Sequence, residues 1–220
     1  MLNRITPVVK YLLIANVLIY FIGSGLPEEV FYGNFAFFNP FLPNTADPIN
    51  PLFKPWQIIS HMFLHSGTGH LFSNMFGLFM FGPALEAYMG SKKFSIYYIL
   101  CGIGAVILQG VLNYYDMSQL SVDSPQFADS VVSKMVGASG AIFGILGAFG
   151  YLFPNVEMML LFFPFPLKAK YFVTLYGLYE LVQGAARFQT GIAHFAHLGG
   201  LITGLVLLRF VNFRMQKGLR

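Results

Sequence analysis

The chain has 220 residues, of which 56% are hydrophobic and only 10% are charged, and its mean hydropathy is +0.64. Soluble domains carry about 25% charged residues, so this composition excludes a soluble fold as well as a disordered chain or a coiled coil. A disulfide scaffold is also excluded, because Cys101 is the only cysteine. The sequence shows no internal repeat and no change in composition that would mark a second domain. We therefore expect one all-α, polytopic membrane domain over residues 1–220.

The expected membrane spans are uncharged apolar runs close to the ~20 residues that cross a bilayer as a helix. In chain order they are expected at residues 11–26, 70–89, 94–115, 137–155, 170–186 and 191–210. The runs are too long and too rich in Gly and Leu for buried strands, and a six-helix bundle satisfies its backbone hydrogen bonds internally. The first run also fits a cleaved signal peptide, because Arg4 and Lys10 precede its apolar core, but its removal would leave five spans.

Two long connections interrupt the apolar runs. Residues 27–55 hold half of the 12 prolines together with several phenylalanines. This aromatic content favours a segment that lies in the outer membrane interface. Residues 113–133 are polar and acidic, and we expect an exposed loop there.

The distribution of basic residues indicates the orientation. Six spans place both termini on one side of the membrane, and all but three of the 13 Lys and Arg residues fall on that side. The exceptions are Lys54, Lys134 and Arg187. Because cytoplasmic loops carry the excess of Lys and Arg, both termini are expected in the cytoplasm. The pI near 9.1 then reflects attachment to the membrane surface rather than nucleic-acid binding.

Polar side chains within or beside the expected spans are few, and such residues are functional candidates by default. They are His61, His65, His70, Asn74, Ser139, Glu180, Gln183, His194 and His197. In the expected topology all of them fall toward the outer side of the membrane. Separate helices would bring them to a similar depth, which predicts one site near the outer face.

Ser139 opens the fourth expected span within Gly137-Ala138-Ser139-Gly140. Glycines at 144 and 147 continue the helical spacing from Gly140 and leave a bare stripe, which permits close approach of another helix. Packing in such a stripe would by itself explain a serine here. Ser139 alone therefore does not indicate catalysis, and a catalytic role requires a second residue beside it.

His197 is that partner. It shares one face of the sixth span with Gly200 and Gly204, which follow at i+3 and i+7. Glycine stripes on both spans would bring Ser139 within hydrogen-bond reach of His197, and a serine beside an imidazole is the minimal pair of nucleophile and base. The alternative is a structural histidine that bonds a carbonyl group. His194 lies one turn nearer the outer surface, where we expect it to be solvated, and this favours His197 as the base.

His70 and Asn74 are four residues apart on the second span and therefore share a face. Both side chains donate hydrogen bonds, and acyl transfer needs donors that point at the developing oxyanion. The backbone N–H of Ser139, at a helix start, is a third donor. A polar clamp between helices is the alternative interpretation of the pair.

His61 and His65 are also four residues apart, which suits a metal pair, and His70 would complete a three-histidine zinc site. Against this, the segment contains no HExxH motif and no Asp or Glu to act as a base. We therefore expect the pair to brace the outer loop beside the site, with no metal or cofactor bound.

Taken together, these residues resemble the rhomboid family of intramembrane serine proteases. The matching motifs are His61-x3-His65-x4-His70-x3-Asn74, Glu86 with Gly90-Ser91, Gly137-Ala138-Ser139-Gly140, and Ala196-His197 with Gly200 and Gly204. Each motif alone is weak, but they occur in the right order across all six expected spans.

The resemblance implies a rhomboid-like bundle of six transmembrane helices and a serine endopeptidase with a Ser–His dyad that lacks a third acid. Ser139 would be the nucleophile, His197 the general base, and His70 and Asn74 the oxyanion hole. Supporting residues would be His61, His65, Gly137, Gly140, Phe143, Gly200 and Gly204. No cofactor or metal is implied, and the partners would be the lipid bilayer and transmembrane protein substrates, cut near their outer ends, rather than nucleic acid.

The resemblance also implies the cellular location of the protein and the route by which a substrate enters the site. We expect a multi-pass protein of the bacterial inner membrane. The segment 187–193 would cap the site, and the fifth span would border the path by which the substrate arrives.

Two positions depart from the family pattern. Where many members have Trp-Arg in the first loop, this chain has Trp56-Gln57, and we expect the loss of the charge to loosen the loop. Where many members carry a Tyr that stacks on the catalytic histidine, this chain has Phe143, which should preserve the stacking. The sequence leaves the roles of Glu180 and Gln183 open. A transporter or channel lined by them, or an inactive client-binding relative, is the rival hypothesis.

Overall fold

The computed structural model describes residues 5–160, 163–186 and 193–210, and this part of the chain is mostly helical, as expected. Its helices are α1 (Pro7–Ser24), α2 (Glu28–Phe35), α3 (Gln57–Ser60), the 3-10 turn η1 (His61–Phe63), α4 (Thr68–Met89), α5 (Ser91–Ser118), α6 (Pro125–Val132), α7 (Ser139–Leu152), α8 (Ala169–Ala185) and α9 (His194–Phe210). The all-α expectation omitted two short antiparallel ladders. They pair β1 (Phe37–Phe38) with β2 (Lys134–Met135), and β3 (Glu157–Leu160) with β4 (Phe163–Lys168).

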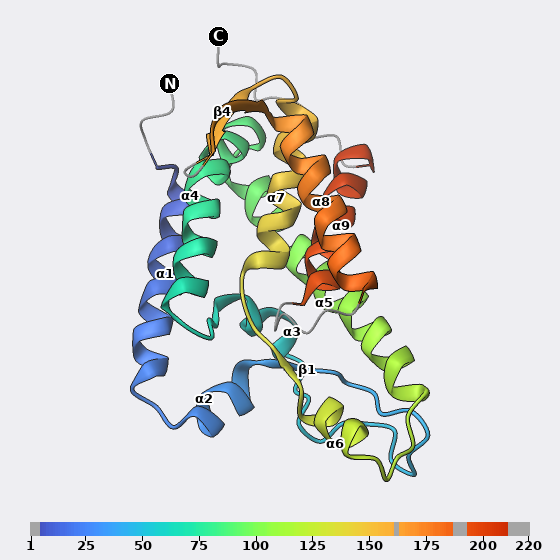
Figure 1. Ribbon diagram of the computed structural model, residues 1–220. Coiled ribbons are helices and arrows are strands. Elements are labelled where there is room, and N and C mark those ends of the chain that lie inside the picture. The colour runs from blue at the N-terminus through green and yellow to red at the C-terminus, as the bar shows by residue number, and fades with distance from the viewer. Residues whose placement is uncertain (1–4, 161–162, 187–192, 211–220) are drawn as a thin grey trace.

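Each expected span overlaps one long helix, namely α1, α4, α5, α7, α8 or α9, although α1 begins four residues before the expected 11–26 and α5 extends three residues beyond each end of 94–115. The start of α1 and the end of α9 lie at the same end of the bundle, while α2 and α6 lie at the opposite end (Figure 1). Helix α7 is shorter than the expected 137–155, because Gly137 has a positive φ of 122° and interrupts the helix before Ser139. The expected start of the last span at 191 lies outside the described residues.

Length and hydropathy support membrane crossing more strongly for some of these helices than for others. Among the described helices, α1 with 18 residues and α5 with 28 are long and apolar enough to span a bilayer, whereas α7 with 14 and α9 with 17 are apolar but shorter. Fourteen residues at 1.5 Å each cover about 21 Å, less than the ~30 Å hydrocarbon core. The expected count of six spans is therefore only partly supported by the helices themselves.

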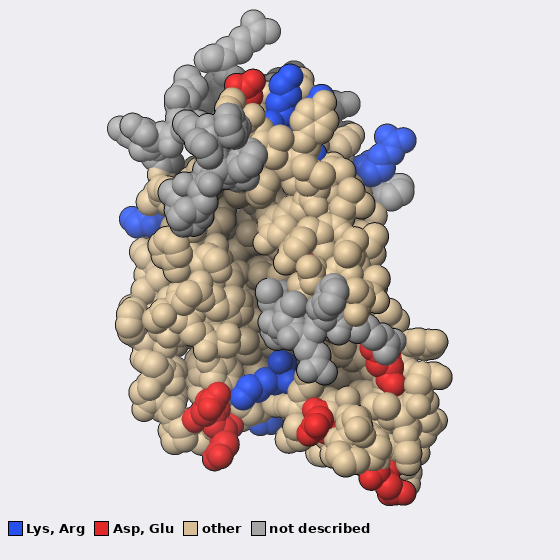
Figure 2. All heavy atoms as spheres, viewed as in Figure 1, with Lys and Arg blue, Asp and Glu red and all other residues tan. Residues whose placement is uncertain are grey.

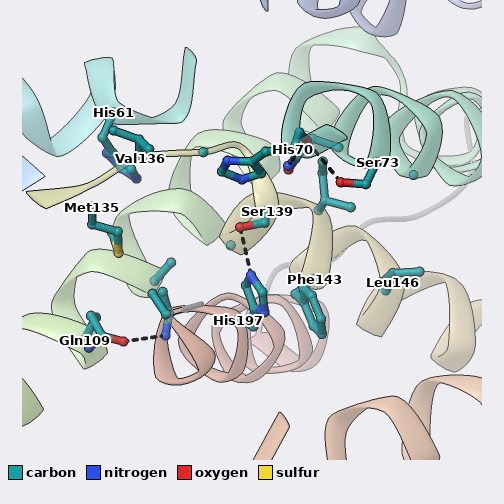
Figure 3. A pocket seen from close by; sticks show the side chains of 18 of the residues that line it. His61, His70, Ser73, Gln109, Met135, Val136, Ser139, Phe143, Leu146 and His197 are labelled. Carbon is teal, nitrogen blue, oxygen red and sulfur yellow. Dashed lines mark hydrogen bonds between the residues drawn. The ribbon is translucent and has the colours of Figure 1, made fainter. Parts of the chain in front are cut away.

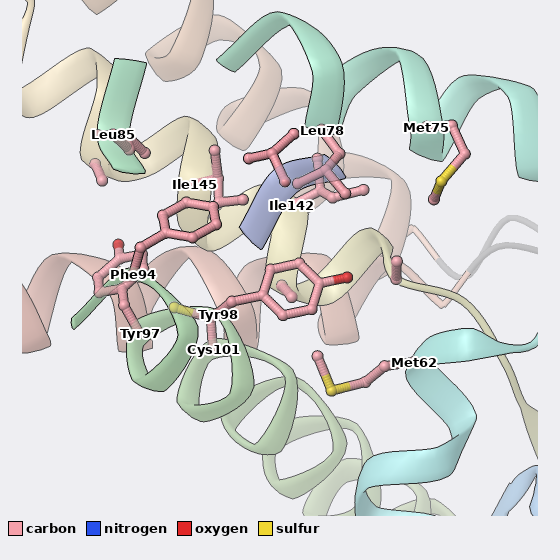
Figure 4. Packing of buried hydrophobic residues seen from close by; sticks show 14 of the residues in the cluster. Met62, Met75, Leu78, Leu85, Phe94, Tyr97, Tyr98, Cys101, Ile142 and Ile145 are labelled. Carbon is pink, nitrogen blue, oxygen red and sulfur yellow. The ribbon is translucent and has the colours of Figure 1, made fainter. Parts of the chain in front are cut away.

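Helix α7 forms the centre of the bundle. It is built from glycine and apolar residues on every face, which predicts burial all round, and each residue from Gly140 to Gly150 is buried. Side chains from η1, α4 and α5 pack around it (Figure 4). The labelled members of this core are Met62, Met75, Leu78, Leu85, Phe94, Tyr97, Tyr98, Cys101, Ile142 and Ile145.

A carboxylate from α4 completes the beginning of α1. The first amides of a helix have no partner within it, and the side chain of Thr6 does not cap this one. The buried carboxylate of Glu86 accepts hydrogen bonds from the amides of Val8 at 3.0 Å and Val9 at 2.9 Å, and from the hydroxyl of Ser91 at 2.7 Å. A negative charge at this position also complements the helix dipole. Glu86 thereby ties α1 to α4.

The expected exposed loop at 113–133 is wrong in part, because it contains the end of α5 and the whole of α6. The hydroxyl of Ser124 caps α6 by accepting a bond from the amide of Phe127 at 3.2 Å, and Pro125 occupies the first helical position. Both residue types are strong start signals. Helix α6 packs near the connection between α2 and α3, whose Asn50 side chain donates to the carbonyl of Val131 at 3.1 Å.

The connection between α2 and α3 (residues 36–56) is braced without the charge that many rhomboid-like sequences carry there. Gln57 is fully buried, its oxygen accepts from the amide of Lys54 at 3.0 Å, and its nitrogen donates to the carbonyl of Leu52 at 3.1 Å. The indole of the adjacent Trp56 donates to the carbonyl of Asn34 at 2.8 Å. A neutral amide therefore makes bonds that hold this loop, and the expected loosening stays a prediction.

Charged side chains gather toward the two ends of the molecule and leave a broad uncharged belt between them (Figure 2). Many large apolar side chains of the long helices are exposed, among them Phe21, Phe72, Ile107 and Val206. Exposed apolar surface on this scale is unfavourable in water but favourable in lipid. The surface is that of a membrane protein.

Candidate active site

Ser139 and His197 meet inside the bundle. The Nε2 atom of His197 lies 2.9 Å from the Oγ atom of Ser139 (Figure 3). Ser139 is the first residue of α7 and is half-buried, while His197 lies one turn into α9 and is buried. Both line a cavity of about 1130 Å³. The pair expected from the sequence thus has the geometry of a nucleophile and a base.

Glycines set the separation of the two helices. A Cβ atom placed on Gly200 would overlap the carbonyl group of Gly140, and one on Gly204 would collide with Gly144. The backbones of α7 and α9 therefore touch along the face that carries His197. Since neither glycine pair leaves room for a methyl group, the contact fixes the position of His197 relative to the start of α7.

Two further contacts fix the position of His197, one at its ring and one at the helix turn that carries it. The ring of Phe143 stacks on the ring of His197, with centroids 4.2 Å apart and planes 8° from parallel. The side-chain oxygen of Gln109 on α5 accepts a hydrogen bond from the amide of Ala196 at 3.1 Å, which anchors the first turn of α9. Stacking by Phe143 matches the expectation. Gln109 is a site residue that was not expected from the sequence, although it too is a polar residue within an apolar run.

His70 reaches the serine from α4 (Figure 3). Its Nδ1 atom is 3.4 Å from the amide of Ser66 and 3.0 Å from the hydroxyl of Ser66. Its Nε2 edge occupies the space that a side chain at Gly137 would need, directly beside Ser139. An amide can only donate, so Nδ1 is the acceptor and the proton of the neutral ring belongs on Nε2, which faces the serine.

Asn74 lines the same cavity but points its amide elsewhere. The Nδ2 atom donates to the backbone carbonyl of His70, one turn earlier on α4, at 2.8 Å. The Oδ1 atom is buried and has no hydrogen-bond partner among the described residues. The structure therefore brings Asn74 to the site, with its side chain bonded to its own helix.

His61 and His65 lie beside the site. His61 Nδ1 is 2.9 Å from the carbonyl of Gln57, and the carbonyl of His61 accepts from the amide of Gly137 at 2.9 Å. The ring of His65 packs edge-on against His70, with centroids 5.1 Å apart. Burial lowers the pKa of both residues to about 4, so both rings are neutral at pH 7. Their contacts are those of a brace between the outer loop, α4 and the segment before α7.

A carboxylate lies beside the second ring nitrogen of His197. Glu180 of α8 is buried, and its Oε2 atom lies 2.6 Å from Nδ1 of His194 and 3.1 Å from Nδ1 of His197. The expectation that His194 is solvated is wrong, because α8 covers it and supplies this partner. Gln183, one turn further along α8, is partly exposed. Of the segment 187–193 that was expected to cap the site, only Ala193 is among the described residues.

Comparison with known proteins identifies the wider group. The family model described as Rhomboid domain matches residues 53–212. Rhomboid protein 1, a mitochondrial protein of Saccharomyces cerevisiae, is 31% identical over 161 residues, which cover 73% of this chain and 43% of that protein. Rhomboid protease AarA of Providencia stuartii is 33% identical over 159 residues, which cover 69% of this chain and 54% of that protein.

A third relative, the putative rhomboid protease YdcA of Bacillus subtilis, is 31% identical over 152 residues, which cover 69% of this chain and 65% of that protein. In all three comparisons the chain spans less than two thirds of the relative's length. The family match nevertheless extends over well more than half of this chain and includes every side chain of the site described above. The chain therefore belongs to the rhomboid family of integral membrane proteins.

Proposed function

We propose that this chain is an intramembrane serine endopeptidase that cuts transmembrane segments of other membrane proteins near the outer membrane face. The observation that carries the proposal is the 2.9 Å contact between Ser139 and His197 in a large cavity of the bundle. Protease relatives, including AarA, support the same reaction class. A transporter path or an inactive client-binding role would give no reason for a serine and an imidazole to meet in this geometry.

The reaction follows from the positions of the side chains. Ser139 attacks the scissile carbonyl carbon while Nε2 of His197 takes the hydroxyl proton, and the new C–O bond gives a tetrahedral oxyanion. The protonated His197 then gives its proton to the leaving amine as the C–N bond breaks. Water, activated by the same imidazole, hydrolyses the acyl-enzyme and restores Ser139.

The oxyanion would rest against α4 and the start of α7. The Nε2–H group of His70 faces this region, and the backbone amide of Ser139 is a further donor at a helix start. Asn74 becomes a donor when its amide turns from the carbonyl of His70 into the cavity, a rotation that keeps it on the same helix face. Each such donor typically contributes about 3 kcal/mol of transition-state stabilisation.

The cavity is lined both by polar groups and by apolar groups, as this chemistry needs. Its polar end is lined by Glu28, Ser66 and Lys134 at the end of the molecule that carries α2, where water is available. Its apolar lining includes Phe172 and Tyr176 of α8. We place the transmembrane substrate along α8 and the hydrolytic water at the opposite, polar end.

The membrane arrangement is part of the proposal. We assign α1, α4, α5, α7, α8 and α9 as six spans, with both termini in the cytoplasm and the protein in a bacterial inner membrane. The excess of Lys and Arg on the terminal side supports this orientation. A fluorescent protein that matures only in the cytoplasm should fluoresce when it is fused to the C-terminus.

The deciding experiment is cleavage of a transmembrane test substrate by the purified 220-residue chain in detergent and in vesicles. The wild type should release two fragments, and Ser139→Ala should release none. Cleavage by Ser139→Ala at the wild-type rate would overturn the proposal, and sensitivity to a zinc chelator in that variant would assign the activity to a metalloprotease.

A further inference from the structure

The geometry points to Glu180 as a positioning residue for His197, so that Ser139, His197 and Glu180 act together as a triad rather than a dyad. This inference rests on the proposed protease function and extends it. It concerns the second nitrogen of the catalytic ring. Nε2 faces Ser139, and Nδ1 lies 3.1 Å from the carboxylate oxygen of Glu180 on the other side of the ring.

The tautomer of His197 explains why this position matters. A neutral imidazole carries one proton, and Nε2 must be unprotonated if it is to accept the proton of Ser139. The remaining proton then belongs on Nδ1. A carboxylate beside Nδ1 favours that tautomer, and it stabilises the imidazolium that forms when the serine attacks. Glu180 is 2% exposed, so its charge acts on the ring with little screening by water.

The carboxylate is shared between two rings. His194 Nδ1 lies 2.6 Å from Oε2 in an aligned hydrogen bond, while Nδ1 of His197 has no aligned hydrogen-bond partner among the described residues although the same oxygen is 3.1 Å away. Catalytic hydrogen bonds are often loose before the substrate binds and tighten as charge develops. His194 therefore holds the carboxylate in place, and a small turn of the His197 ring completes the second bond when the ring becomes charged.

Glu180, His194 and His197 are also candidates for binding a metal ion, because their ligand atoms all lie within 4.8 Å of one another. The separations favour proton sharing instead. Ligand atoms around a tetrahedral zinc ion with bonds of about 2.0–2.1 Å are roughly 3.3 Å apart. Separations of 2.6 Å and 3.1 Å to one oxygen are those of hydrogen-bond partners. A bridging carboxylate between two imidazoles is therefore the better interpretation.

Few other titratable groups face this cluster in the described part of the chain. Tyr176 lies on α8 one turn before Glu180, and His70 approaches His197 from α4. Phe143 of α7 covers the face of the His197 ring. Glu180 is thus the negatively charged group closest to the base, and its removal should change how the activity depends on pH.

The test compares Glu180→Gln with the wild type in pH profiles of kcat and kcat/KM for a transmembrane substrate. We expect kcat to fall about 10- to 10³-fold, since loss of the equivalent carboxylate from serine protease triads costs about 10⁴-fold and this contact is less aligned. We also expect the acid limb of kcat/KM to move to lower pH, because the imidazolium loses a neighbouring negative charge. Glu180→Asp, which keeps the charge, should leave that limb in place. Gln183→Ala, on the same helix, should behave as the wild type.

A purely structural role would lower kcat and leave the acid limb where it is, and that outcome would overturn the inference, as would an unchanged Glu180→Gln. Inhibition of the wild type by a zinc chelator would overturn it in favour of a metal. The test also separates this inference from the proposed function, because cleavage by Ser139→Ala would refute the protease itself whatever Glu180 does.

A second measurement does not depend on the folding of any Glu180 variant. Nitrogen-15 NMR of histidine-labelled wild-type protein, with the His197 signals assigned by their loss in His197→Asn, reports which ring nitrogen carries the proton. A proton on Nδ1 and none on Nε2 at neutral pH supports the triad. The reverse tautomer would show that Glu180 does not position the base.

Discussion

Gly200 of α9 lies so close to Gly140 of α7 that the carbonyl group of Gly140 fills the space where a side chain of residue 200 would begin. The two glycines lie next to the two residues that do the proposed chemistry, Ser139 and His197. Backbone contact, rather than side-chain packing, therefore determines the distance across the site.

The first prediction follows from this contact. Gly200→Ala should push α9 away from α7 and break the bond between Ser139 and His197, because no neighbouring side chain can give way. A displacement of about 1 Å lowers activity about 10²-fold, and overpacking of this kind destabilises by about 1–3 kcal/mol. Cleavage rates and thermal unfolding in detergent would measure both effects. Gly33→Ala is the control, since a Cβ there meets nothing within 4 Å. Full activity in Gly200→Ala would mean that the helices separate at no cost to the site.

The second prediction separates the two histidines of α9. His197→Ala should eliminate both cleavage and labelling of Ser139 by a fluorophosphonate, because only His197 has a ring nitrogen within 2.9 Å of the serine hydroxyl. His194→Ala should keep much of both, since His194 bonds Glu180 and does not touch the serine. Gel-based labelling of purified variants measures this directly. Loss of labelling in His194→Ala with labelling retained in His197→Ala would reverse the assignment.

The third prediction concerns the oxyanion donors. Asn74→Ala should lower kcat about 10²-fold or more with little change in KM, because a donor used only in the transition state is lost. Steady-state kinetics with a transmembrane substrate would show this. Phe72→Ala, a change at an exposed position on α4 outside the cavity lining, is the control. A raised KM with an unchanged kcat would make Asn74 a residue for substrate binding or packing.

The fourth prediction concerns stability rather than catalysis. Glu86→Gln should destabilise the protein by about 1–3 kcal/mol, because a charged acceptor for the amides of Val8 and Val9 is replaced by a neutral one in a buried position. Unfolding of the purified protein by denaturant in mixed micelles would measure the change. Glu29→Gln, at an exposed position, should have little effect. Equal stability of the two variants would show that the cap of α1 does not depend on the charge.

Part of this arrangement could be read from the sequence for clear physical reasons. Apolar runs revealed the long helices, because lipid-facing and core-facing surfaces both require apolar residues. The spacing of Gly200 and Gly204 after His197 revealed the face of α9 that meets α7, because residues three and seven positions apart lie on one face of a helix. Helix α6 was overlooked even though Ser124-Pro125 is a strong start signal, because the polar composition of its surroundings outweighed that signal.

The partner of Glu180 could not be read from the sequence. Its contact with His194 and His197 depends on how α8 packs against α9, which the periodicity of either helix alone does not determine. The bracing role of Gln57 was missed for a related reason. Its bonds go to backbone groups of a loop with no periodic pattern, so these hydrogen bonds can be recognised only in the folded loop.

The cap that Glu86 provides for α1 has a consequence for the order in which the chain assembles. The amides of Val8 and Val9 are made first, but the carboxylate that satisfies them follows 78 and 77 residues later. Until the ribosome has delivered the end of α4, the first helix has an uncapped beginning. The first two long helices should therefore reach their final pairing as a unit, before the helices that carry Ser139 and His197 have been synthesised.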